Sequence, residues 1–156
     1  MVSRRKSIAP RIRSARPADI EPIARLFRLV RETCLPYLPR LHSPAEELAY
    51  FHDRVWPNNT VWVAGEASLD GFCAWRAGWV DHLYIRPDRH RAGLGTALLS
   101  QAMAGQAALR LWVFQRNAQA LRFYTARGFR AVEHTNGSRN EEREPDTLME
   151  WVRGVP

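Results

Sequence analysis

Cysteine is scarce in this chain of 156 residues, which contains only Cys34 and Cys73. The two do not form a C-x-x-C pair, and no histidine stands at ligand spacing from either, which argues against a disulfide framework and a zinc site. We expect both thiols to be reduced and buried, and we expect no bound metal. At this length, with 46% apolar residues, a chain buries a full core without cross-links. Residues 11–156 are therefore predicted to form one domain.

Long apolar runs are also missing. The only long uncharged run, 92–109, is interrupted by Ser100, Gln101, Gly105 and Gln106, so it does not predict a membrane-spanning helix. The basic N-terminus lacks the apolar segment of a secretory signal. We therefore expect a soluble, cytoplasmic protein with no membrane partner.

Acidic residues are absent from the first sixteen positions, which hold six positive charges: Arg4, Arg5, Lys6, Arg11, Arg13 and Arg16. Because the formal net charge is +7, the rest of the chain is nearly neutral. Residues 1–10 are predicted to be a basic, poorly ordered arm. The alternative is an RNA-binding or RNA-modifying protein that uses this arm, and its binding would collapse as salt is added. Nucleic acid is not the partner we expect.

The chain does contain a regular succession of strand and helix patterns. Alternating and β-branched segments predict strands over 11–15, 60–65, 71–75, 79–85, 109–113, 129–133 and 147–152. Caps and apolar spacing predict helices over 17–34, 43–52, 94–105 and 117–128. This order is an α+β pattern. We expect a mixed, mostly antiparallel central sheet of about six to seven strands, flanked by about four helices.

The most informative stretch is 83–96, in which an apolar strand runs through a basic turn into a helix. Gly93 and Gly95 leave the backbone uncovered, so consecutive amides and the positive end of the helix can converge on a phosphate. Arg89 and Arg91 add charge beside them. A dinucleotide-binding domain is disfavoured, because Leu98 stands where its third glycine is required.

Two motifs carry a resemblance to a known family. The stretch 83–99, Leu-Tyr-Ile-Arg-Pro-Asp-Arg-His-Arg-Ala-Gly-Leu-Gly-Thr-Ala-Leu-Leu, is followed after one strand by N-x-x-A-x-x-F-Y-x-x-x-G-F, which begins at Asn117. Together they resemble the GNAT superfamily of acetyl-CoA-dependent N-acetyltransferases. The resemblance extends over 12–151 and implies a GNAT-like fold.

The resemblance also implies a cofactor site for acetyl-CoA. The backbone of residues 83–85 is expected to face the pantetheine arm, and the turn is expected to hold the pyrophosphate. The implied cofactor-binding residues are Leu83, Tyr84, Ile85, Arg89, Arg91, Ala92, Gly93, Leu94, Gly95, Thr96 and Asn117. The chain departs from the family at His90, where Gln or Arg is usual. We expect Arg89 or Arg91 to supply the missing charge.

The implied reaction is direct transfer of an acetyl group from the thioester to an amine. Tyr124 is expected to protonate the departing thiolate, with a packing role as the alternative. The resemblance implies a base at or near this point of the strand ahead of the glycine turn, and Asp81 is the residue expected there. Strand alternation places Asp81 on the face of Leu83 and Ile85, with His82 on the opposite face. A water chain, with Asp81 as a solvated carboxylate, is the alternative.

The acceptor amine is expected on the side of the acidic loop 139–146, which holds four negative and two positive charges. Expected substrate-binding residues are Tyr37, His42, Trp79 and Glu142. A primary amine of a small molecule, a protein or a peptide would fit, and a homodimer is possible. An inactive GNAT fold that senses acetyl-CoA is a further alternative.

Overall fold

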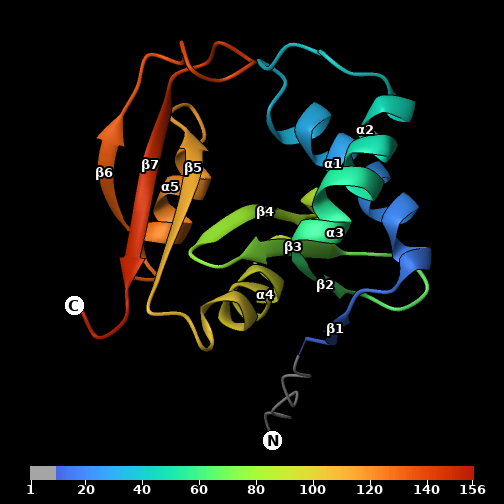
Figure 1. Cartoon of the computed structure of the whole chain (residues 1–156), viewed down its shortest axis with the longest axis horizontal. Coiled ribbons are helices and arrows are strands. Elements are labelled where there is room, and N and C mark those ends of the chain that lie inside the picture. The colour runs from blue at the N-terminus through green and yellow to red at the C-terminus, as the bar shows by residue number, and fades with distance from the viewer. Residues whose placement is uncertain (1–9) are drawn as a thin grey trace, which may run out of the picture.

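In the computed structural model, which describes residues 10–156, seven strands form one sheet (Figure 1). The strands are β1 (Ile12–Ser14), β2 (Thr60–Ala64), β3 (Gly71–Arg76), β4 (Trp79–Ile85), β5 (Ala108–Phe114), β6 (Arg130–His134) and β7 (Asp146–Val152). Their order is β1-β2-β3-β4-β5-β7-β6, and every neighbouring pair is antiparallel except β4 and β5. The expected mixed, mostly antiparallel sheet is confirmed. Apart from Pro10, the expected basic arm lies outside the described residues.

Four helical segments flank the sheet within the described residues. They are α1 (Ile20–Cys34), a continuous helix of α2 (Pro44–Tyr50), a π-helical turn (Phe51–Val55) and α3 (Trp56–Asn58), then α4 (Leu94–Met103) and α5 (Ala118–Thr125). The hydroxyl of Ser43 accepts the amide of Glu46 at 3.1 Å and confirms the expected start of α2. The expected end near His52 is wrong, because Phe51 and Val55 prolong the buried face of this helix. None of the described helices is both long and apolar enough to span a membrane.

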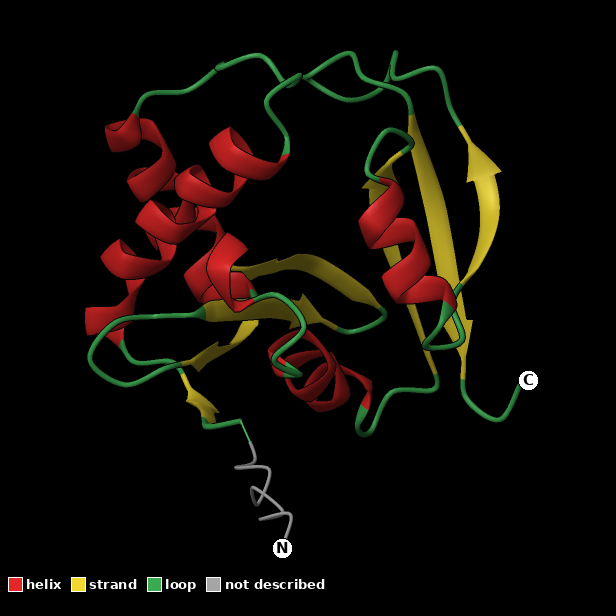
Figure 2. Ribbon diagram, turned by 180° about the vertical axis from the view of Figure 1, so that it is seen from behind, coloured by secondary structure: helices red, strands yellow, loops and turns green. Residues whose placement is uncertain are grey.

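The helices cover the two faces of the sheet. Helix α1 and the α2–α3 helix pack on one face, in a core that contains Phe51 and Phe72. Helices α4 and α5 share the other face (Figure 2), in a core that contains Leu98 and Phe129. Because both cores rest on the same central strands, the sheet fixes where α4 and α5 begin relative to each other.

Strands β4 and β5 separate soon after they start. Their parallel pairing consists of one pair, Trp79 opposite Arg110, supported by a 2.9 Å hydrogen bond from the Arg110 amide to the carbonyl of Gly78. Beyond this point β5, β7 and β6 turn away from β1–β4 (Figure 1). The edge of β4 at Leu83–Ile85 therefore has no strand partner on the β5 side, which leaves its backbone groups open to a ligand.

A β-bulge interrupts the pairing of β4 with β3. Ala74 is opposite His82, but Trp75 is opposite Val80, so Asp81 is the extra residue. A bulge breaks the strict alternation of side chains along a strand. The prediction that Asp81 shares the face of Leu83 is therefore wrong, because Val80, and not Asp81, joins the core on that side.

The first turn of the chain is anchored by a buried carboxylate. Asp19, only 8% exposed, accepts hydrogen bonds from the guanidinium of Arg13 at 2.7 and 2.9 Å and from the amide of Arg16 at 2.7 Å. The Arg13 contact, followed by the Arg16 amide, holds the pKa of Asp19 below its ordinary value despite burial. These bonds fix β1 to the start of α1.

The variant Asp19→Asn tests this anchor. Because charge-assisted hydrogen bonds are lost, we expect the free energy of unfolding at neutral pH to fall by about 2 kcal/mol. The folded-state pKa is depressed, so this stabilisation is present above the ordinary pKa of aspartate and is lost as pH falls through the folded-state pKa. Urea unfolding at neutral and acid pH measures the difference, with exposed Asp53→Asn as control. A parent–variant difference that stays constant toward acid pH would contradict this role.

Candidate active site

A pocket of about 300 Å³ lies where β4 leaves β5. The end of β4, the start of α4 and one side of α5 form its walls. Its lining contains Val30, Cys34, Leu35, Leu83, Tyr84, Ile85, Arg89, His90, Arg91, Gly93, Leu94, Gly95, Thr96, Asn117, Gln119, Ala120, Phe123, Tyr124 and Arg127. The structure thus brings together Tyr124 and every residue predicted to bind the cofactor except Ala92, which does not line the pocket.

The start of α4 offers unpaired amides to this pocket. Its N-cap, Gly93, has a φ of +80° and no side chain that could cap the helix. The first turn contains no acidic residue, and the amides of Leu94, Gly95 and Thr96 make no hydrogen bond within the described residues. The first amide that finds a partner is that of Ala97, which donates to the carbonyl of Gly93 at 3.0 Å. Three adjacent donors at the positive end of a helix form an anion-binding arrangement.

His90 ties the turn to its surroundings. Its Nε2 lies 2.9 Å from the carbonyl of Ile85, and its Nδ1 lies 3.2 Å from the side-chain amide nitrogen of Gln119. A carbonyl only accepts and an amide nitrogen only donates, so Nε2 carries the proton and Nδ1 is an acceptor. His90 therefore holds the turn against β4 and α5.

The turn contributes two cations to the lining of the pocket, Arg89 and Arg91. Arg89 lies 3.5 Å from the carboxylate of Asp70, which takes up part of its charge. Arg91 adopts a φ of +66° and has no ion pair within the described residues. A further cation, Arg127, lines the pocket from the end of α5. Sequence reasoning missed Arg127, although its spacing of four residues from Phe123 places both on one face of a helix.

Tyr124 lies in the wall of the pocket on α5 and is 9% exposed. Its ring packs edge-on against Phe123 and Phe129, at centroid distances of 5.1 and 5.4 Å. Burial raises the pKa of Tyr124 strongly. Because of this raised pKa, the phenol keeps its proton at ordinary pH. Its hydroxyl makes no hydrogen bond within the described residues, so the O–H group is free to donate in the pocket.

Asp81 is not part of this pocket. Its carboxylate accepts hydrogen bonds from Arg76 at 2.8 and 3.2 Å and from the side chain of Asn59 at 2.8 Å. The bulge turns it toward these partners, so the expected approach of Asp81 to the reacting amine is corrected. The expected role of Trp79 in substrate binding is corrected as well. Trp79 begins β4 where this strand is still paired with β5, and the guanidinium of Arg76 lies over its ring.

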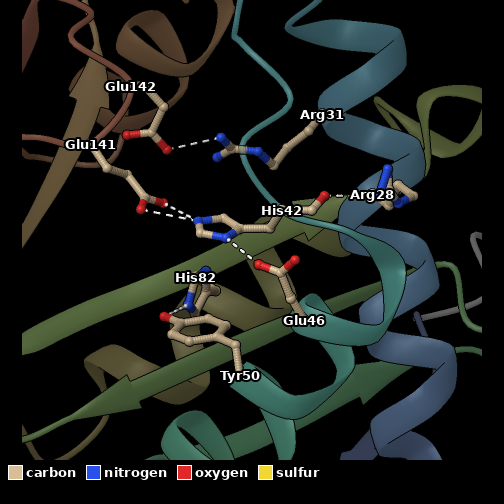
Figure 3. Close-up of polar contacts among 8 residues, drawn as sticks. All are labelled: Arg28, Arg31, His42, Glu46, Tyr50, His82, Glu141 and Glu142. Carbon is tan, nitrogen blue, oxygen red and sulfur yellow. Dashed lines mark hydrogen bonds and ion pairs between the residues drawn. The ribbon is translucent and has the colours of Figure 1, made fainter.

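The acidic loop 139–146 is joined to the α1–α2 side of the molecule (Figure 3). Arg31 of α1 pairs with Glu142 at 2.9 Å, and His42 contacts Glu141 at 3.0 Å and Glu46 at 3.2 Å. The two carboxylates raise the pKa of His42, with Glu141 as the larger cause. The expected gathering of His42 and Glu142 on one side is observed. The carboxylate of Glu142, however, forms an ion pair with Arg31. The expected role of Glu142 in attracting the substrate amine is therefore corrected.

Tyr37 joins the same contact region from the connection between α1 and α2. The guanidinium of Arg116 lies 4.0 Å from the centre of its ring and pairs with Glu144 at 2.7 Å. The hydroxyl of Tyr37 is buried without a hydrogen-bond partner within the described residues. Tyr37 thus packs against the guanidinium of Arg116 and joins the α1–α2 connection to the segment that follows β5.

A half-buried histidine lies beneath these contacts. His82 stands among Phe27, Phe51 and Phe72, and its Nε2 lies 2.9 Å from the hydroxyl of Tyr50 (Figure 3). This confirms that it lies on the face of the sheet opposite Leu83. Burial lowers the pKa of His82 to about 4, so the ring is neutral at ordinary pH. No cluster of histidine, cysteine or acidic residues with metal-binding geometry is found in the described part of the chain.

A second pocket, of about 380 Å³, adjoins the acidic loop. Trp112 and Phe114 line it from β5, on the strand face opposite Leu111 and Val113, which belong to the core beneath α5. Glu142 closes it toward α1. The two pockets thus lie on opposite faces of the sheet, near the same separation of β4 from β5.

Comparison with known proteins agrees with this geometry. Residues 57–131 match the family model described as the acetyltransferase (GNAT) domain. Over 94 residues the chain is 31% identical to the peptidyl-lysine N-acetyltransferase YiaC of Escherichia coli K12. The match spans 60% of this chain and 62% of that relative.

Solved structures share the fold over nearly the whole chain. The apo form of YjaB from Escherichia coli is 23% identical, with a TM-score of 0.74 over 93% of this chain and 99% of that chain. YncA from Salmonella typhimurium, solved with acetyl-CoA, is 22% identical, with a TM-score of 0.68 over 93% and 94%. With the matching family model and the arrangement of the glycine turn, α4 and α5, these findings show that the chain has the fold of the GNAT acetyltransferases and that residues 57–131 match their domain.

Proposed function

We propose that this protein transfers an acetyl group from acetyl-CoA to a primary amine of a small molecule or a peptide. The observation that carries the proposal is the pocket in which three unpaired amides of α4 and the hydroxyl of Tyr124 face the open edge of β4. The family supports the proposal, and so does the acetyl-CoA found with YncA.

The residues present fit acetyl-CoA. The pyrophosphate meets the amides of Leu94, Gly95 and Thr96, which have no other partner in the described residues. The peptide-like pantetheine arm meets the edge of Leu83–Ile85 that lacks a strand partner on the β5 side, where the carbonyl of Ile85 is already engaged by His90. Asn117 caps α5 by accepting the amide of Ala120 at 3.2 Å and presents its side chain in the same pocket.

The chemistry needs a neutral amine and a proton for sulfur. Bound acetyl-CoA supplies a thioester, and attack by the amine nitrogen on its carbonyl carbon forms the C–N bond and breaks the C–S bond. Tyr124 holds the proton that the departing thiolate takes up, because burial keeps its phenol protonated. The ammonium first loses one proton to water on the side of the acidic loop, since Asp81 is engaged with Arg76 and Asn59. After attack the nitrogen loses a second proton through water, and this proton restores the phenol of Tyr124.

The acceptor approaches from the side of the acidic loop. Glu141 and Glu46 are the exposed carboxylates there, since both lie more than half exposed beside His42. They favour a cationic chain over an anionic acceptor. The relative named a peptidyl-lysine N-acetyltransferase makes the lysine side chain of a peptide the first acceptor to test.

A panel of amines tests the proposed activity. Lysine-containing peptides, a polyamine and an aminoglycoside are incubated with acetyl-CoA, and release of the CoA thiol is followed. We expect turnover with at least one class and none with an acetylated peptide, which lacks a free amine. Tight binding of acetyl-CoA with no turnover across the panel would favour a sensor of acetyl-CoA instead.

The variant Gly93→Val tests the phosphate-binding turn. A side chain at a φ of +80° is strained by roughly 1–2 kcal/mol, and relief of that strain moves the amides that follow. We expect calorimetry to show acetyl-CoA binding at least tenfold weaker, equivalent to about 1.4 kcal/mol. Gly105→Val is the matched control, because its φ is +77° and open space surrounds it outside the pocket. Equal affinity in the two variants would contradict the site.

The variant Tyr124→Phe tests the proton donor. The ring still packs against Phe123 and Phe129, so we expect the affinity for acetyl-CoA and the melting temperature to change little. Turnover with a good amine should fall by about 10²-fold, the scale of general acid catalysis. Turnover of Tyr124→Phe at the parental rate would show that Tyr124 only packs against its neighbours.

Asp81→Asn serves as the companion variant. Because its carboxylate is bound to Arg76 outside the pocket, we expect the pH profile of turnover to keep its acidic limb. Loss of that limb in Asp81→Asn would make Asp81 the base after all.

A further inference from the structure

The pocket contains an electrostatic imbalance at the start of α4. The amides of Leu94, Gly95 and Thr96 have no partner within the described residues, and the first turn lacks an acidic residue. Both ring nitrogens of His90 are engaged, one with the carbonyl of Ile85 and the other with the side chain of Gln119. The positive end of the helix is therefore neither capped nor neutralised by the residues of its own turn.

Arg127 is brought to this same end from α5. Its Nε and Nη2 donate to the hydroxyl of Thr96, at 3.0 and 2.5 Å, and its Nη1 donates to the carbonyl of Phe123 at 2.8 Å. The guanidinium stacks on the ring of Phe123, 3.7 Å from the ring centre. These contacts hold the cation in one place before any ligand arrives.

The guanidinium still has unused donors. Arginine carries five N–H groups, and the contacts with Thr96 and Phe123 use three of them. Two donors therefore remain, one on each terminal nitrogen, on a side chain that lines the pocket.

No carboxylate balances Arg127. It makes no ion pair within residues 10–156, and the sequence of residues 1–9 contains no aspartate or glutamate. A cation beside the positive end of a helix is repelled unless an anion lies close to both. Close helix packing brings Arg127 to the start of α4. Gly95 has no side chain, so α4 can approach the ring of Phe123.

We propose that Arg127 binds the pyrophosphate of CoA together with the amides of α4. This inference rests on the proposed function. A bound phosphate accepts the remaining N–H groups of the guanidinium as charge-assisted hydrogen bonds and neutralises both positive features at once. In this role Arg127 supplies charge from beyond the turn, in addition to Arg89 and Arg91, which line the same pocket.

The experiment compares Arg127→Gln with Arg122→Gln. Both variants remove one positive charge, Arg122 from α5 and Arg127 from the turn that follows it, but Arg122 is exposed and does not line the pocket. Calorimetry measures the dissociation constants of CoA and of pantetheine, which lacks the pyrophosphate, at low and high salt. A third variant, Arg127→Lys, keeps the charge and loses the fork of donors.

For Arg127→Gln we expect CoA binding at least tenfold weaker than in the parent, an unchanged affinity for pantetheine and a smaller loss of CoA affinity as salt is added. Arg127→Lys should lie between the parent and Arg127→Gln, and Arg122→Gln should resemble the parent. Parental CoA affinity in Arg127→Gln would overturn the inference. So would an equal weakening of CoA and pantetheine, which would show that Arg127 only joins α5 to α4.

The outcome for the parent separates this inference from the proposed function. If the parent itself fails to bind CoA, the proposed function fails. If the parent binds CoA and Arg127→Gln binds it equally well, only the role of Arg127 fails. Melting temperatures of the three variants show whether each is folded under the conditions of the binding measurement.

Discussion

The separation of β4 from β5 is the constraint on which the pocket depends. The two strands share a single pair, Trp79 with Arg110, and diverge beyond it. In a continuous sheet this edge of Leu83–Ile85 would be bonded to the next strand, but here it has no strand partner, and the carbonyl of Ile85 contacts His90 instead. Unpaired backbone groups are costly when buried, so this edge is stable only beside solvent or a ligand. A binding site for a peptide-like chain follows directly from the sheet topology.

Two different interactions keep the halves of the sheet at a fixed separation. On the side of α4 and α5, an apolar core joins Leu98, Leu111 and Tyr124 and so links both halves. On the opposite side, the pair of Arg31 with Glu142 and the contact of His42 with Glu141 tie α1 and its following loop to the acidic loop. The acidic loop therefore stabilises the opening that it borders, and most of its charge is matched within the protein.

The two ends of the site differ in their electrostatics. At the acceptor end Arg31, His42 and Arg116 each face a carboxylate, so part of the negative charge is matched, while Glu141 and Glu46 stay exposed. At the phosphate end the uncapped start of α4 and the guanidinium of Arg127 lie side by side with no described carboxylate to balance them. Binding of a polyanion is thus favoured at one end only. This asymmetry orients a molecule that carries its phosphates at one end and its reactive thioester at the other.

The sequence by itself determined the features that depend on neighbouring residues: the glycine turn at 93–95, the cap at Asn117, the mixed sheet with its flanking helices, and the resemblance to the GNAT superfamily. These follow from backbone sterics and short-range hydrogen bonds, which act within a few positions. Tertiary structure alone decided the rest. The bulge at Asp81 arises from pairing with β3, Glu142 meets an arginine 111 positions away, and Arg127 reaches α4 through helix packing. Such contacts depend on how distant elements pack, which no local pattern encodes.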